Sequence, residues 1–238
     1  MTPPASSDHE TLASRGGTPV RGTWLPVALP WIGEREKQLV LETLESGWIS
    51  TGPRAEELGR RIAELAGARR GLAVNSCTTA LHLALAGLGI GPGDEVITST
   101  YTFVSSVNVI THVGARPVLA DVEAGTLCID PREIERALTP RTRAILTVDY
   151  AGQPCDYDAV LAIARARGLP VIADAAHALG ASWHDRPVGS LVDVTAFSFY
   201  AIKNLTTGEG GAVVTDDEAL MERMAVLSLH GMDRAAWK

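Results

Sequence analysis

The sequence predicts an α/β fold in which a mostly parallel sheet is covered by helices on both faces. From residue 68 onward, strand-like and helix-like segments alternate, an order that is typical of βαβ units. The strand-like segments are continuous apolar runs, such as AILTV at 144–148 and VIADA at 171–175. A strand that is buried on both faces requires this pattern. With 238 residues, of which 46% are hydrophobic, the chain is long enough to bury such a core.

Two segments precede this alternation. Residues 1–23 are rich in Thr, Ser, Pro and Gly without periodicity, and we expect a disordered tail. Residues 24–67 are predicted to be an N-terminal helical segment with two helices. In the first, GEREKQLVLETLESG places Leu39, Val40 and Leu44 on one face. The second is RAEELGRRIAELAG, whose final glycine ends the helix.

Residues 68–238 are predicted to form one large domain. In chain order, the expected strands are 71–76, 95–99, 116–122, 142–150, 169–175, 193–200 and 210–216. The expected helices are 77–89, 101–114, 131–140, 158–168 and 217–231, with a hairpin at 180–189. The connection between the last two strands is too short for a crossover helix, so these strands are predicted to be antiparallel.

Composition excludes several classes of function. The net charge is −7, whereas a nucleic-acid-binding surface needs a basic surplus or patch. The three cysteines are far apart and lack CxxC spacing, which argues against a disulfide framework or a zinc cluster and favours a reducing compartment. We find no apolar run of about 20 residues and no signal-peptide core. The expectation is a cytoplasmic protein without a nucleic-acid or membrane partner.

Lys203 is the first candidate for chemistry. The chain has only three lysines against 18 arginines, and Lys203 lies in the glycine-bearing segment AIKNLTTGEGG between two predicted strands. Ligands of such sheets bind beyond the carboxyl ends of the strands. A partly desolvated lysine there has a lowered pKa and can form a Schiff base with a carbonyl. The alternative is an ordinary surface lysine.

Asp174 ends the predicted strand LPVIADA among apolar residues. A carboxylate buried there needs a cationic or hydrogen-bonding partner, and the protonated ring nitrogen of pyridoxal phosphate is such a partner. The alternative is a helix cap. His177 follows three residues later, but no third ligand is apparent nearby, so no metal site is predicted.

A phosphate group requires free backbone amides at the start of a helix, and NSCTTALHLAL, which contains Cys77 and Thr78, offers such a start. An ordinary capped helix is the alternative. Ser198 could add a hydroxyl to the phosphate, and Phe103 is either a ring-stacking residue or a core aromatic. GxGxxG after the first strand, GxxxxGK[ST] and GxSxG are all missing, which argues against a dinucleotide site, a P-loop and an α/β-hydrolase.

Together these segments resemble the DegT/DnrJ/StrS family of pyridoxal-phosphate-dependent nucleotide-sugar aminotransferases. The similar stretches run in family order from about residue 25 to the end: SGWISTGP, NSCTTALHLALAGLGIGPGDEVIT, TYTFVSS, GARPVLADV, DYAGQPCDYDAV, PVIADAAHALGA and FSFYAIKNLTTGEGGAVVTD. The last is highly specific. The resemblance is closest to the branch that acts on UDP-4-keto sugars, and it implies an aspartate-aminotransferase-like fold (fold type I).

The resemblance also implies roles for individual residues. Lys203 would bond to pyridoxal 5'-phosphate and move the proton of the amino donor. Asp174 would pair with the ring nitrogen, and His177 would lie near the 3-hydroxyl. Phe103 would stack on the ring. The phosphate would be held by the backbone of Cys77 and Thr78 and by the Ser198 hydroxyl.

The implied reaction is ping-pong transamination from an amino acid, usually glutamate, to a nucleotide-linked keto sugar. Family members are homodimers, and SGWIST is expected to contribute to a site with the partner. Two departures matter: Tyr200 stands where the similar branch often has His, and the chain stops where relatives continue into a smaller C-terminal domain. We therefore expect that small domain to be missing and the substrate site to be incomplete.

Two other functions remain open on the sequence. One is a truncated or regulatory paralogue that binds pyridoxal phosphate or dimerises without turnover. The other is a different Schiff-base enzyme on the same fold, such as a desulfurase or a small-amino-acid lyase. A desulfurase needs a cysteine on a mobile loop, and none of the three is in an obvious one.

Overall fold

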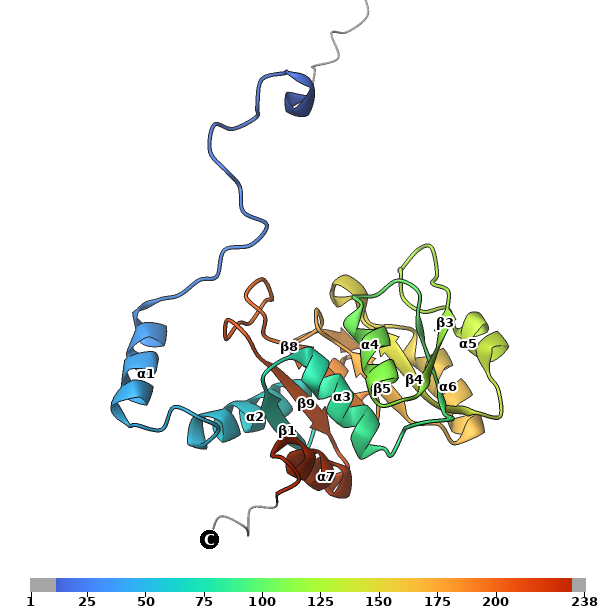
Figure 1. Cartoon of the computed structure of the whole chain (residues 1–238). Helices are drawn as coiled ribbons and strands as arrows, with labels where there is room; N and C mark the ends of the chain where they lie inside the picture. The colour runs from blue at the N-terminus through green and yellow to red at the C-terminus, as the bar shows by residue number, and fades with distance from the viewer. Residues whose placement is uncertain (1–11, 233–238) are drawn as a thin grey trace, which may run out of the picture. The chain divides into compact units, whose positions relative to one another are not determined.

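The computed structural model describes residues 12–232, and the chain divides into two compact units, Met1–Trp31 and Ile32–Lys238. In the first unit the described residues contain one short 3-10 helix, η1 (Ala13–Arg15), and none of its residues is buried (Figure 1). Residues 1–11 of the predicted tail and residues 233–238 of the predicted large domain lie outside the described residues. The boundaries 1–23, 24–67 and 68–238 stay predictions.

The second unit is built on a seven-stranded sheet whose order is β1-β9-β8-β5-β4-β2-β3. The strands are β1 (Arg70–Val74), β2 (Glu95–Ser99), β3 (Arg116–Ala120), β4 (Thr142–Val148), β5 (Val171–Asp174), β8 (Val194–Ser198) and β9 (Gly211–Thr215). The predicted hairpin forms β6 (Ser182–Trp183) and β7 (Arg186–Pro187). The five strands β3, β2, β4, β5 and β8 run parallel to one another. The predicted antiparallel pairing of the last two strands, β8 and β9, is confirmed.

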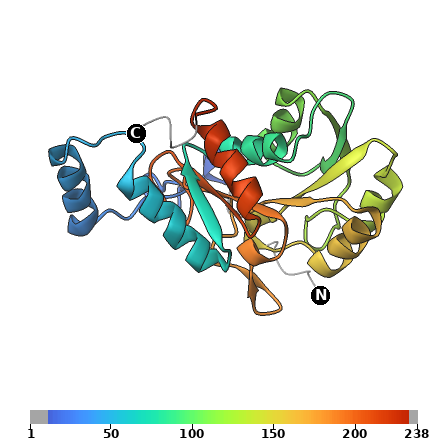
Figure 2. The same cartoon turned by 90° about the horizontal axis from the view of Figure 1, so that it is seen from below.

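Helices cover both faces of this sheet (Figures 1 and 2). On one face α3 (Cys77–Gly87) contacts both α4 (Ser105–His112) and α7 (Glu218–Ser228). On the other face lie α2 (Pro53–Ala66), α5 (Pro131–Ala137) and α6 (Tyr157–Arg167). Successive strand residues alternate between the two cores: Val96, Leu146 and Val213 belong to the first, and Ile97, Ile145 and Val214 to the second. This two-sided burial explains the continuous apolar runs.

The first strand of the sheet departs from the simple alternation. β1 pairs antiparallel with β9 and forms an edge of the sheet, so it is not a neighbour of β2. β9 in turn pairs antiparallel with β8, which makes β1 parallel to β8. The carboxyl end of β1 therefore faces the same edge of the sheet as the carboxyl ends of the parallel strands.

Two predicted helices differ in detail from the observed ones. α1 (Glu34–Glu45) forms as predicted, but its apolar face is not buried in this chain: Val40 and Leu44 are each 60% exposed. The helix expected at 101–114 begins only at Ser105. The delay has a local cause, since the Ser99 hydroxyl hydrogen-bonds both the amide and the carbonyl of Tyr101 and holds a turn there. The 3-10 turns η2 (Tyr150–Gly152) and η3 (Val188–Ser190) were not predicted.

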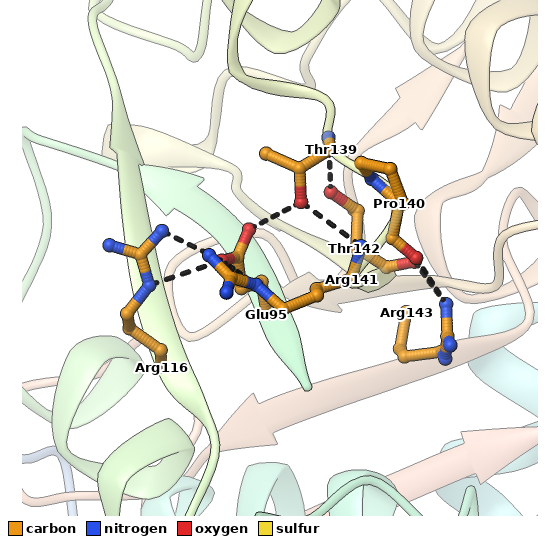
Figure 3. Close-up of polar contacts among 7 residues, drawn as sticks. All are labelled: Glu95, Arg116, Thr139, Pro140, Arg141, Thr142 and Arg143. Carbon is orange, nitrogen blue, oxygen red and sulfur yellow. Dashed lines mark hydrogen bonds and ion pairs between the residues drawn. The ribbon is translucent and has the colours of Figure 1, made fainter. Parts of the chain in front are cut away.

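The amino ends of the parallel strands are tied together by one buried carboxylate (Figure 3). Glu95 begins β2, lies opposite Arg116 of β3 and is fully buried. Its carboxylate accepts hydrogen bonds from Thr139 Oγ1 at 2.6 Å, Arg116 Nη2 at 2.7 Å and Arg141 Nε at 2.7 Å. These bonds, with that of Thr139 the largest cause, lower the pKa of Glu95 to about 2. Glu95 thus joins three successive segments of the fold at the edge remote from the carboxyl ends.

Candidate functional site

The carboxyl ends of the strands bring the predicted residues to one edge of the sheet. Asp174 is the last residue of β5, and Ser198 is the last residue of its neighbour β8. Cys77 and Thr78 open α3, which begins shortly after β1, and Lys203 lies in the connection from β8 to β9. Electrostatic interactions of Lys203 with both Cys77 and Asp174 show that these three come together.

Asp174 is a buried carboxylate, 4% exposed, whose hydrogen-bond donors are all neutral. Its Oδ2 accepts a hydrogen bond from Ser106 Oγ at 2.6 Å. Its Oδ1 accepts one from the Ala176 amide at 3.2 Å, and the Cys77 thiol lies 3.7 Å away. The capping alternative is therefore partly right, because Asp174 holds a turn, but no helix follows. Within residues 12–232, no cationic group hydrogen-bonds this carboxylate.

Lys203 is half-buried, and its amide donates to the Tyr200 carbonyl at 2.9 Å. Burial lowers the pKa of its amine, and the nearby Asp174 and Cys77 oppose that change. The amine makes no hydrogen bond to any residue of the described chain. The sequence prediction of a desolvated lysine on this loop matches this geometry, and the environment favours an amine that is available for reaction.

His177 follows Asp174 and is fixed by a backbone contact. The Ala151 amide donates to His177 Nδ1 at 3.2 Å, so the neutral imidazole carries its proton on Nε2. Burial, followed by the charge of Lys203, lowers the pKa of His177, while Asp174 opposes the change. The donor is held in an unusual conformation, because Ala151 has a φ of 53°. The ring is therefore a neutral, oriented group at this edge.

The start of α3 offers free amides. Ser76 caps the helix by accepting a hydrogen bond from the Thr79 amide at 3.1 Å. The amides of Cys77 and Thr78 have no acceptor in the described chain, as expected for a first helical turn. Gly211 of β9 passes directly beneath: a Cβ there would lie 2.5 Å from the Ser76 carbonyl carbon and 2.6 Å from the Cys77 nitrogen. Only glycine allows this approach, which presses the helix start against the sheet.

Ser198 and Phe103 complete the set of predicted residues. Ser198 is buried, and its hydroxyl accepts a long hydrogen bond of 3.4 Å from the Tyr200 amide. Phe103 is 76% exposed, which rules out the core-aromatic alternative. Its ring makes no stacking contact with another described ring, so its face is open to a ligand.

Several residues at this edge were missed by sequence reasoning. Ser106 and Thr102 share a hydrogen bond of 2.8 Å, and their four-residue spacing is a signal that was present in the sequence. Tyr101, which follows β2, and Tyr150 of η2, which follows β4, share a hydroxyl–hydroxyl hydrogen bond of 3.1 Å that no local pattern indicates.

Asp149 follows β4 and is only 1% exposed. Burial raises its pKa to about 6, although Tyr157 and the Cys155 amide donate hydrogen bonds to it. All three cysteines are buried. Among residues 12–232 no cluster of metal-binding side chains occurs, and no helix there is long and apolar enough to cross a membrane.

Comparison with known proteins gives consistent similarities. Residues 30–238 match the model of the DegT/DnrJ/EryC1/StrS aminotransferase family. The chain is 56% identical over 217 residues to the spore coat polysaccharide biosynthesis protein SpsC of Bacillus subtilis, covering 91% of this chain and 56% of the relative.

Solved structures share the fold. The putative sugar aminotransferase Spr1654 of Streptococcus pneumoniae, in its PMP form, superposes with a TM-score of 0.85 at 40% identity, covering 90% of this chain and 59% of that one. DesI, solved with its TDP-sugar product, gives a TM-score of 0.88 at 37% identity, covering 94% and 58%. The predicted fold class is confirmed. The chain spans somewhat more than half the length of these relatives.

Proposed function

This chain belongs to the DegT/DnrJ/EryC1/StrS aminotransferase family, and we propose that its site serves pyridoxal-phosphate-dependent transfer of an amino group to a sugar. The acceptor is a nucleotide-linked keto sugar, and the donor is an amino acid, glutamate by preference. One observation carries the proposal. The half-buried amine of Lys203 lies close to a buried carboxylate, Asp174, that has no cationic hydrogen-bond partner in the described chain.

The residues present fit this cofactor. Asp174 supplies the charge that a protonated ring nitrogen requires, and the free amides of Cys77 and Thr78 supply donors for a phosphate. The buried hydroxyl of Ser198 adds to the phosphate site, and the open face of Phe103 suits a planar ring. When bound, pyridoxal phosphate supplies an electron sink for the carbon beside the amino group of the substrate.

Lys203 and His177 would have different roles in the reaction. Lys203 would hold the cofactor through its aldehyde carbon, and its free amine would accept the proton from the carbon that bears the donor's amino group and deliver it to the carbon that was the aldehyde. The lowered pKa of Lys203 raises the fraction of amine that can act as a base near neutral pH. His177, whose pKa is also lowered, would stay neutral and could donate its Nε2 proton to an acceptor on the bound ring.

The relatives support the substrate class. SpsC is named for polysaccharide biosynthesis, Spr1654 is a putative sugar aminotransferase, and DesI was solved with a TDP-sugar. We further propose that the protein acts as a homodimer in the cytoplasm. The three buried cysteines are poorly placed for a desulfurase, which needs an accessible thiol on a mobile loop.

The test is trapping with borohydride. The purified chain is mixed with pyridoxal phosphate, reduced, digested and mapped by mass spectrometry. We expect the label on Lys203, whereas Lys37, exposed on α1, reports non-specific labelling. Lys203→Arg keeps the charge and should abolish the specific label. Loss of the cofactor's yellow colour on adding glutamate, but not cysteine or alanine, supports the donor. A folded chain with equal label on Lys203 and Lys37 overturns the proposal.

A further inference from the structure

The side chains behind Asp174 form an ordered hydrogen-bond chain that reaches the turn carrying Phe103. Ser106, the second residue of α4, is fully buried, and its Oγ lies 2.6 Å from Asp174 Oδ2. Thr102 Oγ1 lies 2.8 Å from Ser106 Oγ on the other side. Phe103 is the next residue after Thr102 and is the residue proposed to face the cofactor ring.

The direction of the protons in this chain follows from elementary chemistry. An ionised carboxylate can only accept hydrogen bonds, so the single proton of the Ser106 hydroxyl points at Asp174. In the 2.8 Å contact between the two hydroxyls Thr102 must then be the donor, and its proton has one competing acceptor, the Phe103 carbonyl, at the longer distance of 3.2 Å. A serine inside a helix commonly bonds a carbonyl of the preceding turn, but here the hydroxyl is directed away from its own helix. The chain therefore runs one way, from Thr102 through Ser106 to Asp174.

This arrangement leaves the two carboxylate oxygens in different environments. Oδ2 is held by the short hydroxyl bond, whereas Oδ1 has the Ala176 amide at 3.2 Å and only a long thiol contact at 3.7 Å from Cys77. Because Oδ2 is held, rotation of the Asp174 carboxylate about its Cβ–Cγ bond would break a buried, charge-assisted hydrogen bond.

We propose that Ser106, supported by Thr102, is the positioning residue that fixes the Asp174 carboxylate for the ring nitrogen of the bound cofactor. The inference rests on the proposed function. Ser106 does not touch the reacting atoms; it acts through Asp174 and links the orientation of that carboxylate to the turn that carries Phe103.

Ser105 provides a matched control. It is the preceding residue, it is also buried, and its hydroxyl makes no hydrogen bond to another described residue. Ser106→Ala and Ser105→Ala therefore remove the same atom from adjacent positions of one helix. Ser106→Thr restores the hydroxyl, and Thr102→Val removes only the support behind it.

The experiment measures binding and the protonation of the ring nitrogen. Each variant is checked for folding by circular dichroism and titrated with pyridoxal phosphate, and ¹⁵N-labelled cofactor reports by NMR whether its ring nitrogen carries a proton. We expect Ser106→Ala to weaken binding by about tenfold or more, the loss of one hydrogen bond to a charged group, and to move the ¹⁵N signal toward the unprotonated position. Thr102→Val should have a smaller effect in the same direction, and Ser106→Thr should recover both readouts.

The possible outcomes distinguish failure of the role assigned to Ser106 from failure of the proposed function. If the wild-type chain labels at Lys203 but Ser106→Ala matches Ser105→Ala in affinity and ¹⁵N signal, the assignment of Ser106 is wrong and the proposed function stands. If Ser106→Ala loses affinity while the ¹⁵N signal stays that of the wild type, the effect is structural and the assignment is also wrong. A wild-type chain that takes no label overturns both.

Discussion

Replacing Asp149 by Asn should make the protein more stable at neutral pH and change how its stability depends on pH. Asp149 is 1% exposed, and burial raises its pKa from 3.8 to about 6. Each unit of pKa difference corresponds to about 1.4 kcal/mol, so ionising this carboxyl in the folded chain costs about 3 kcal/mol relative to the unfolded chain.

The sign follows from proton binding. Between pH 3.8 and about 6 the folded chain holds a proton on Asp149 that the unfolded chain has released. The free energy of unfolding therefore falls as the pH rises through this range, and above it the full cost remains. The amide side chain of the Asp149→Asn variant would keep an oxygen for the Cys155 amide, which donates to Asp149 Oδ1 at 3.0 Å, without any charge to bury.

Urea unfolding of the wild type and Asp149→Asn at several pH values between 4 and 8 measures this effect. We expect the variant to gain about 2.4 kcal/mol on the wild type as the pH rises from 4 to 7, because about 0.6 kcal/mol of the full cost of about 3 kcal/mol is already present at pH 4. Asp185→Asn is the control, because Asp185 is exposed and has a left-handed backbone that Asn tolerates. A difference between the wild type and Asp149→Asn that is constant over the whole range would refute the reasoning.

Three further perturbations test other features. Ala151→Gly relieves a left-handed alanine (φ 53°) and should raise the free energy of unfolding by about 0.5–1 kcal/mol in urea; a loss would show that the turn is not strained. Gly211→Ala places a Cβ 2.5 Å from the Ser76 carbonyl carbon and should cost about 1–3 kcal/mol and weaken pyridoxal phosphate binding, whereas Gly125→Ala, with open space around it, should do neither. The pKa of Glu95 is lowered to about 2, so its stabilising effect is complete above pH 4.5 and is lost as the pH falls through 2; Glu95→Gln should flatten the acid limb of the stability curve, and an unchanged limb would contradict the assignment.

The sequence predicts the class of fold and most of its elements, because a strand that is buried on both faces must be a continuous apolar run. The apolar runs predict β4 and β5, and the short link between β8 and β9 predicts their antiparallel pairing. The structure confirms these predictions. The position of β1 in the sheet has no such signature in the sequence, because its antiparallel pairing with β9 depends on contacts between residues far apart in the chain. The exposed apolar face of α1 shows the same limit, because periodicity predicts a face but not what covers it.

For the site, the sequence indicates which strand ends carry chemistry but not how neighbouring side chains are ordered. Lys203 and Asp174 stand out by composition and context, and their roles remain predictions. Ser105 and Ser106 are chemically the same in the sequence, and only the packing of α4 decides which hydroxyl meets the carboxylate. The pKa of Asp149 likewise depends on complete burial, which a residue at the end of a strand does not reveal.

The pairing of β1 with β9 also governs when the site can form. The start of α3 follows β1, yet it is held against the sheet by Gly211, which lies at the beginning of the last strand. Contacts between segments so far apart in sequence form late, because the entropy of closing the long loop must be offset first. On the ribosome, the early helical and strand segments must wait for β9 before the sheet edge closes. The amides at the start of α3 therefore reach their final position only after β9 has paired with β1.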